Sequence, residues 1–257
     1  MALPSQPLDL IPLWAFFLIT IGLLLLATEG GFQAGLAWQR RDPEKDTAIG
    51  SMVAATLGLV GFLLAVMTSM AADRYDTRRR LVLEEANTIG TAYLRAGYLP
   101  EPYSTESRDL LREYVDVRLT AAQDVEGAIA RSEEIQIELW RRAEALVEAT
   151  GGSDVYALYV ESVTDLVELH HQREIAGLYA RLPSSLLLGL LGFTVLGMFI
   201  LGFGNSYDRR RSVIALVALI LVFGSALYII LDLDRSREGL FQVSDQPLIS
   251  LEERLNP

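Results

Sequence analysis

The sequence contains no cysteine and only one lysine, Lys45, and both shortages exclude classes of chemistry. Without cysteine the chain cannot form a disulfide, a thiol nucleophile, a cysteine-ligated zinc site or an iron–sulfur cluster. A single lysine leaves almost no place for Schiff-base catalysis. Acidic residues outnumber basic ones by 33 to 22, and the net charge of −11 argues against a nucleic-acid partner, whose phosphates need a basic surface.

The usual catalytic and metal-binding motifs are missing as well. No G-x-S-x-G, H-E-x-x-H or glycine-rich phosphate loop is present, and the only histidines are the adjacent His170 and His171. Consecutive helical residues point about 100° apart, so this pair cannot chelate one ion. Glu84 and Glu85 are consecutive too, and we expect them to form salt bridges with the preceding arginines. We therefore expect no catalytic residues, no metal site and no cofactor.

Apolar residues dominate the composition. The chain is 51% hydrophobic and 21% charged, with a mean hydropathy of +0.29, which is too apolar for an ordinary soluble domain. Four uncharged stretches of 19 residues or more are present: Leu10–Thr28, Thr47–Ala72, Leu182–Tyr207 and Ser212–Leu231. A helix needs about 20 residues to cross a bilayer, so the lipid bilayer is the first expected partner. We predict two transmembrane hairpins. The first is formed by residues 1–72 and contains spans at about 10–36 and 47–72. The second is formed by residues 182–233 and contains spans at about 182–207 and 212–231.

Basic residues in short loops predict the orientation of these spans. Arg40, Arg41 and Lys45 follow the first span and Arg209–Arg211 separate the last two, which places both loops in the cytoplasm. The termini and the large segment between spans two and three would then lie outside. Arg74 and Arg78–Arg80 argue the other way, although long segments count less in this rule.

The segment 73–181 is a predicted helical domain outside the bilayer. It carries 21 acidic and 13 basic residues, a net charge of −8, and a tail of residues 234–257 follows the last span. Apolar residues recur at helical spacing, as in Leu110, Tyr114 and Val117 and again in Ile135, Leu139 and Ala143. No period-2 strand pattern occurs. The expected fold is all-α, with four transmembrane helices and a helical extramembrane domain inserted between spans two and three.

The second span has no helix breaker before Gly97 and Pro100, so we expect one helix from Thr47 to Ala96. Small residues cluster within one sector of about 100° of this helix: Gly50, Ala54, Gly58, Gly61 and Ala65. Small residues allow helices to approach closely in lipid. This seam would pack either against another span of the same chain or against a second subunit.

A second face of the same helix combines an apolar part with a polar stripe. Phe62 and Val66 form a predicted pore constriction, followed by a predicted polar mouth of Ser69, Asp73, Arg80, Glu84, Asn87 and Thr91. Apolar constrictions gate channels and charged rings select ions. The alternative is that the stripe is the solvated face of an amphipathic helix whose back, at Val82, Ala86 and Ile89, packs on the helical domain.

Glu29 is the first charged residue after the opening apolar stretch. If the first span continues to Trp38, this carboxylate lies in the membrane or just below the headgroups, where ionisable groups are costly and often functional. If the span stops at Thr28, Glu29 is an interfacial anchor. Gly30 and Gly31 weaken helix continuation and favour the second interpretation.

Two runs resemble the bacterial bestrophin-like family of four-span membrane proteins of unknown function. The first is Asp73-Arg74-Tyr75 with Arg78 to Ala96, and the second contains Asp232-Leu233-Asp234-Arg235 and Val243 to Leu248. The resemblance implies a multi-pass protein of the bacterial plasma (inner) membrane. It also implies kinship with bestrophins, which are pentameric ion channels lined by their second span. The chain has no match to the bestrophin neck motif or calcium-binding acidic cluster, so ion conduction depends on analogy and on the second span.

We reach two hypotheses for the function. The first is a homo-oligomeric ion channel, pentameric by analogy, with the second helix as its pore lining and inorganic ions as its cargo. Because carboxylates outnumber the free arginines at its mouth, we expect cation preference. The alternative is a membrane-anchored interaction or scaffold protein whose acidic helical domain binds a partner.

Overall fold

The structure is a computed structural model that describes residues 7–40, 49–151, 153–207, 212–235 and 238–256. Within these ranges it contains helices and no strand, which confirms the all-α expectation. The elements in chain order are η1 (Pro7–Leu10, a 3₁₀ turn), α1 (Leu13–Gln39), α2 (Ile49–Ala96), α3 (Tyr103–Thr120), α4 (Val125–Thr150), α5 (Asp154–Glu174), η2 (Ile175–Tyr179, a π-helical turn), α6 (Ser184–Asn205), α7 (Val213–Asp234) and α8 (Gln246–Leu255).

Four helical stretches are long and apolar enough to cross a membrane: Leu13–Gln39, Ile49–Ala96, Asp154–Asn205 and Val213–Asp234. Each contains most of one of the four uncharged stretches of the sequence, and in the third that part lies in α6. The chain is therefore a multi-pass membrane protein. The basic residues Arg41, Lys45 and Arg209–Arg211, on which the predicted orientation depends, lie outside the described residues.

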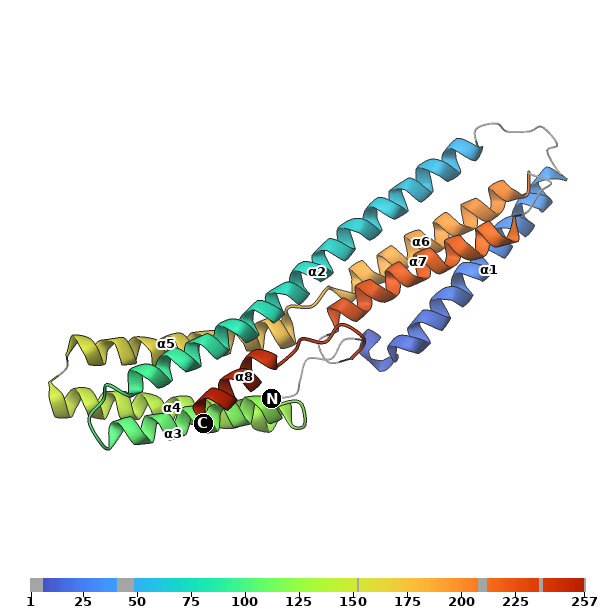
Figure 1. The fold of residues 1–257 in the computed structure, drawn as a ribbon. Coiled ribbons are helices and arrows are strands. Elements are labelled where there is room, and N and C mark those ends of the chain that lie inside the picture. Colours follow the sequence, from blue (N-terminus) through green and yellow to red (C-terminus); the bar gives the residue numbers. More distant parts are fainter. Residues whose placement is uncertain (1–6, 41–48, 152, 208–211, 236–237, 257) are drawn as a thin grey trace. The chain divides into compact units, whose positions relative to one another are not determined.

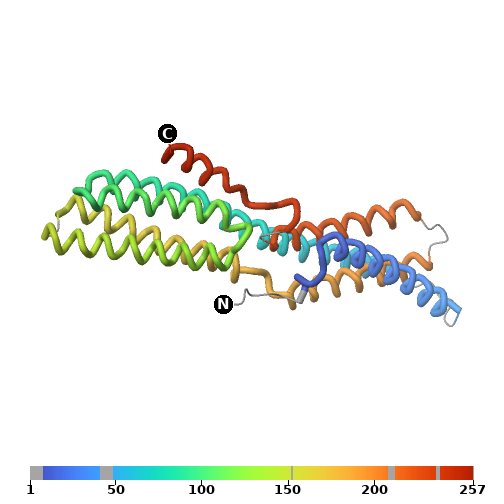
Figure 2. Tube along the Cα trace, turned by 90° about the horizontal axis from the view of Figure 1, so that it is seen from below, coloured from blue at the N-terminus to red at the C-terminus, as the bar shows by residue number. Residues whose placement is uncertain are grey.

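The chain forms two compact units. The span unit contains the described parts of Pro4–Tyr75 and Arg181–Gln242, and the bundle unit contains those of Asp76–Ala180 and Val243–Pro257. Figure 1 shows α1, α6 and α7 running alongside one another in the span unit. In the bundle unit α3 packs on α4, α4 packs on α5, and α8 packs on α3; Figure 2 shows α8 as the dark red helix at the C-terminal end.

Helix α1 continues well past the point where the sequence favoured its end. The argument that Gly30 and Gly31 weaken helix continuation is wrong, because both lie inside a helix that runs to Gln39. Where the membrane-spanning part of this helix ends stays a prediction. An added Cβ at Gly31 would overlap the backbone carbonyl of Phe199 in α6. The glycine is therefore present for close helix packing and not as a helix end.

Helix α2 confirms the expectation of one helix as far as Ala96. Its back face is buried in the core of the bundle unit, through Val82, Ala86 and Ile89. These residues recur at spacings of three and four because one stripe of a helix faces the core. The same core receives the apolar face of α8, at Leu248, Leu251 and Leu255.

Candidate functional site

The residues of the expected constriction and mouth lie on the uncovered surface of α2. Phe62 is 63% exposed and Val66 is 41% exposed in the single chain. Exposed residues on the polar stripe are Ser69, Asp73, Arg80, Glu84, Asn87 and Thr91. The helix thus presents every predicted pore-lining side chain on a surface that its own subunit leaves open.

The three glycines of the small-residue seam are also left uncovered by the part of the chain that the structure describes. A Cβ added at Gly50, Gly58 or Gly61 would meet nothing within 4 Å. The span core instead receives a different stripe of α2, which includes Val60 and Leu64. The packing of α2 within its own subunit therefore leaves these three glycines free for another contact.

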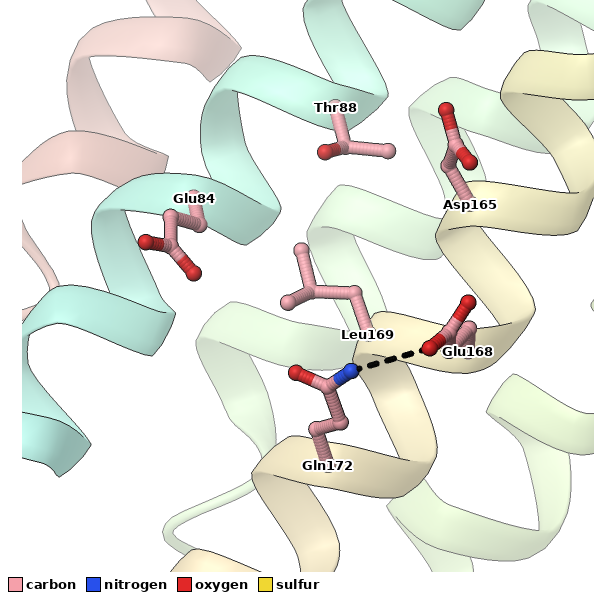
Figure 3. A pocket seen from close by; sticks show the side chains of 6 residues that line it. All are labelled: Glu84, Thr88, Asp165, Glu168, Leu169 and Gln172. Atoms are coloured by element: carbon pink, nitrogen blue, oxygen red, sulfur yellow. Dashed lines mark hydrogen bonds between the residues drawn. The ribbon is translucent and has the colours of Figure 1, made fainter.

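Glu84 faces an open hollow of about 320 Å³ in the bundle unit. Figure 3 shows Glu84 and Thr88 on α2 opposite residues of α5, among them Asp165 and Glu168. Glu168 accepts a hydrogen bond from the side-chain amide of Gln172 at 3.2 Å. Three carboxylates around one hollow make the local potential negative and favour cations. No group of three or more histidines or carboxylates in the described residues is arranged to hold a metal ion.

The neighbouring Glu85 is fully buried and belongs to a different set of contacts. Its carboxylate lies 3.1 Å from Nε of Arg118 and also pairs with Arg173. The expectation that Glu85 pairs with the preceding arginines is wrong. Its side chain lies on the core face of α2, where α3 and α5 supply the guanidinium groups.

Tyr114 extends this buried network to a histidine. Its hydroxyl lies 3.1 Å from Oε1 of Glu85 and 2.9 Å from Nδ1 of His170. Burial, and to a smaller extent the nearby Arg118 and His171, lower the pKa of His170 from 6.5 to about 4. Burial raises the pKa of the Tyr114 phenol. At neutral pH both side chains are therefore uncharged, and the network is a structural hydrogen-bonding unit.

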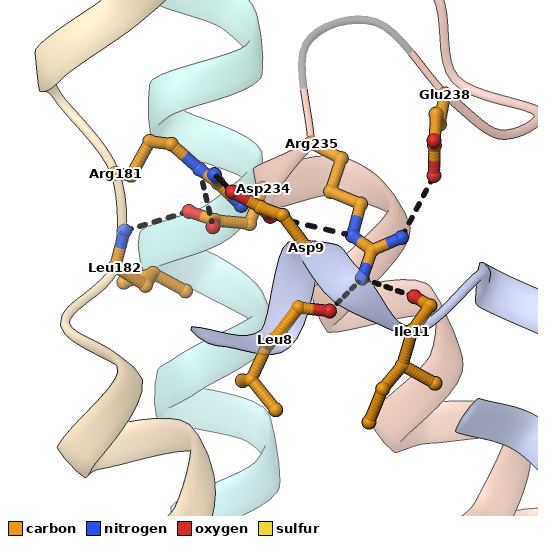
Figure 4. Close-up of polar contacts among 8 residues, drawn as sticks. All are labelled: Leu8, Asp9, Ile11, Arg181, Leu182, Asp234, Arg235 and Glu238. Carbon is orange, nitrogen blue, oxygen red and sulfur yellow. Dashed lines mark hydrogen bonds and ion pairs between the residues drawn. The ribbon is translucent and has the colours of Figure 1, made fainter. Parts of the chain in front are cut away.

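A second buried ionic cluster lies in the span unit, at the end of α7 (Figure 4). Asp234 accepts the backbone N–H of Leu182 at 2.7 Å and pairs with Nε of Arg181 at 3.3 Å. Arg181 also reaches Asp9 of η1 at 2.6 Å. These contacts tie η1, the approach to α6 and the end of α7 together.

Arg235 completes this cluster from the other side. Its guanidinium donates to the backbone carbonyls of Leu8 at 2.5 Å and Ile11 at 2.7 Å, and it pairs with Glu238 at 2.8 Å. Asp232, one turn earlier on α7, accepts the backbone N–H of Leu240. The run Asp232-Leu233-Asp234-Arg235 thus holds three backbone segments in place.

The remaining sequence-predicted residues have simpler surroundings. Glu29 is exposed on α1 and accepts a hydrogen bond from Gln33 at 2.8 Å. His170 is buried in the network just described, whereas His171 is exposed beside Glu174. The two histidines point apart as the helix geometry requires, and they do not form a common site.

Sequence reasoning missed both buried ionic clusters. The signal for the one in the span unit was present, because Asp232, Asp234 and Arg235 directly follow an apolar span. The partners of Glu85 lie 33 and 88 residues further along the chain, at Arg118 and Arg173. No local spacing rule connects such distant positions.

Comparison with known proteins identifies relatives that cover most of the chain. The family model described as a bestrophin-like domain matches residues 21–248. Two structures of a bacterial bestrophin homolog from Klebsiella pneumoniae, each a single-substitution variant, have the same fold. The first is 16% identical in sequence and has a TM-score of 0.69, and the match covers 91% of this chain and 97% of the Klebsiella chain. The second is 15% identical and has a TM-score of 0.71, and the match covers 95% of this chain and 97% of the Klebsiella chain. A search of curated proteins gives no significant match.

Proposed function

The chain belongs to the bestrophin-like family, and from this premise we propose that several copies form an ion channel whose pore is lined by α2. The proposal extends the family assignment to an activity, by analogy with bestrophins. A subunit with four spans can hardly enclose a pore alone, so a symmetric ring is the expected assembly, pentameric by the same analogy.

The exposed face of α2 carries the proposal. Phe62 and Val66 are large apolar side chains that their own subunit leaves uncovered, and Asp73 and Glu84 follow on the same uninterrupted helix. An apolar ring that gates by dewetting and a charged ring that selects ions would account for both groups.

The seam supports an assembly of this kind. A Cβ added at Gly50, Gly58 or Gly61 would meet no atom of the described residues within 4 Å, and small residues promote close helix contact in lipid. We propose that a neighbouring subunit packs on this surface and thereby brings copies of α2 around one axis.

Cations are the proposed cargo. Glu84 lies beside Asp165 and Glu168 at one hollow, so a ring of these carboxylates would concentrate positive ions. Arg80 on the same face donates a hydrogen bond to the hydroxyl of Thr77 at 3.3 Å.

The expected membrane is the bacterial plasma (inner) membrane. The helical domain would lie between spans two and three. The loop arginines place this domain outside, together with both termini.

The test is single-channel recording from the purified protein in a planar bilayer. Wild type should conduct, and Phe62→Ala should raise the open probability or the unitary conductance because it widens the proposed constriction. Leu18→Ala, an exposed apolar truncation on α1, is the control and should change neither. If the wild type forms a monomer without conductance and binds a soluble protein through its acidic domain, the scaffold hypothesis replaces the channel.

A further inference from the structure

The end of the span unit where η1 meets the loop after α7 has an inverted distribution of polarity. Asp234 and Arg235 are buried and paired at this end, whereas Leu10 is 86% exposed and Leu240 is 80% exposed. A water-facing surface places its charges outside and its leucines inside. Buried charges and exposed leucines are the arrangement expected where the protein surface faces surroundings of low polarity.

The described residues around Leu240 are held in place by the rest of the span unit. Gly239 has a φ of +103°, and an added Cβ there would overlap the Asp232 carboxylate and lie 2.9 Å from Cδ1 of Leu13. Both carboxylate oxygens of Asp232 lie 3.1 Å from the N–H of Leu240. The loop therefore rests against the first turn of α1, and its backbone donor is satisfied by the protein instead of by water.

The next residues of the loop are fixed in the same way. The ring of Phe241 packs edge-on against Tyr75, with the ring centroids 6.3 Å apart. The Tyr75 hydroxyl lies 3.4 Å from the carbonyl oxygen of Gln242. Leu240 thus projects from an anchored loop and not from a free tail.

This surface is continuous with the exposed face of a membrane span. Trp14 in the first turn of α1 is 67% exposed, and the exposed Leu18 and Leu25 continue the same stripe along the helix. Tryptophan is enriched where a span meets the headgroups. Leu10 ends η1 shortly before this turn. Gly239, the neighbour of Leu240 in sequence, lies against Leu13 in the same turn.

We propose that Leu10, Trp14 and Leu240 form a lipid-binding surface that inserts into the boundary between the headgroups and acyl chains of the bilayer. Insertion is driven by burial of apolar side chains. Arg181 and Arg235, the two arginines of the described cluster at this end, are paired with carboxylates, so apolar burial and not these two charges supplies the attraction to lipid. Zwitterionic phospholipid is the expected partner.

The absence of cysteine makes a direct test possible. A nitroxide label at Leu240→Cys, in the full chain reconstituted into phosphatidylcholine nanodiscs, reports collisions with oxygen, which concentrates in lipid, and with a water-soluble nickel chelate. Two matched labels at exposed leucines calibrate the measurement: Leu26→Cys within α1 and Leu94→Cys in the bundle unit. We expect an oxygen-to-nickel ratio at Leu240 severalfold above that at Leu94 and below that at Leu26.

Two results would overturn the proposal. A ratio at Leu240 equal to that at Leu94 would mean that the loop lies in water. Low collision rates with both reagents would mean that a second copy of the chain covers it. A label at Leu10→Cys provides an independent measurement on the other segment. Its oxygen-to-nickel ratio should also lie above that at Leu94 and below that at Leu26.

Discussion

Gly202 of α6 lies directly against the backbone carbonyl of Thr28 in α1, so that even a methyl group at position 202 would overlap that oxygen. Gly31 and Gly35 of α1 make reciprocal contacts with α6, at Phe199 and Phe203. The two helices approach through small residues, as membrane spans commonly do. On α2, by contrast, a Cβ added at Gly50, Gly58 or Gly61 would meet nothing within 4 Å among the described residues.

This contact predicts a large effect of one added methyl group. Gly202→Ala should destabilise the span unit by about 1–3 kcal/mol, because the helices must separate to accommodate it. The loss is measured as a lower midpoint of thermal unfolding in detergent. Gly192→Ala on the same helix is the control, since an added Cβ there meets nothing within 4 Å and alanine favours helix. Equal effects of the two substitutions would contradict the packing argument.

The glycines of α2 should behave differently. Gly58→Leu together with Gly61→Leu should disperse the oligomer while the subunit keeps its unfolding midpoint, because a Cβ added at either position would meet no described atom within 4 Å beyond the local helix backbone. Light scattering of the detergent-solubilised protein measures the mass. If the double variant keeps the wild-type mass, the seam is not a subunit contact.

Glu85 should be essential for the stability of the bundle unit. Glu85→Ala would leave the guanidinium groups of Arg118 and Arg173 without their buried carboxylate, at a cost of about 3–5 kcal/mol. Chemical unfolding followed by circular dichroism measures the loss. Glu84→Ala, one residue earlier and exposed, should change stability by less than about 0.5 kcal/mol.

The network around His170 predicts a pH dependence of stability. The folded pKa is about 4 against an ordinary value of 6.5, so between these values the unfolded chain binds a proton that the native chain does not. Stability should therefore fall as the pH is lowered from about 6.5 to 4, by up to about 3 kcal/mol from this residue. His170→Asn should reduce the dependence of the unfolding free energy on pH. His171→Asn, at an exposed position, should leave this dependence unchanged. An identical slope in wild type and His170→Asn would rule out this assignment.

Ion selectivity tests the polar mouth. Under an asymmetric potassium chloride gradient, the wild-type current should reverse near the potassium equilibrium potential. Asp73→Asn with Glu84→Gln should move the reversal potential toward zero, because the double variant removes two carboxylates from every subunit. Reversal of the wild type near the chloride potential would refute cation preference, and an unchanged value in the double variant would refute these residues.

The spans and the length of α2 were accessible from the sequence for a simple reason. A run of about 20 uncharged residues can satisfy its backbone in lipid only as a helix, and nothing between Ile49 and Ala96 breaks that helix. The buried face at Val82, Ala86 and Ile89 followed from its periodicity, since a helix has one side to bury. These are properties of neighbouring residues, and local order in the chain is sufficient to predict them.

Only the tertiary structure could assign partners across the chain. From the sequence we expected Gly30 and Gly31 to weaken the helix, because glycine has a low intrinsic helix propensity. In the structure α6 passes so close to Gly31 that no larger residue fits there. Glu84 and Glu85 look equivalent in sequence, but their 100° separation on α2 places one at an open hollow and the other among arginines of α3 and α5. The sequence by itself determined which segments are helices and which cross the membrane; the packing of distant helices decided which charges are buried, because burial depends on neighbours that no local pattern encodes.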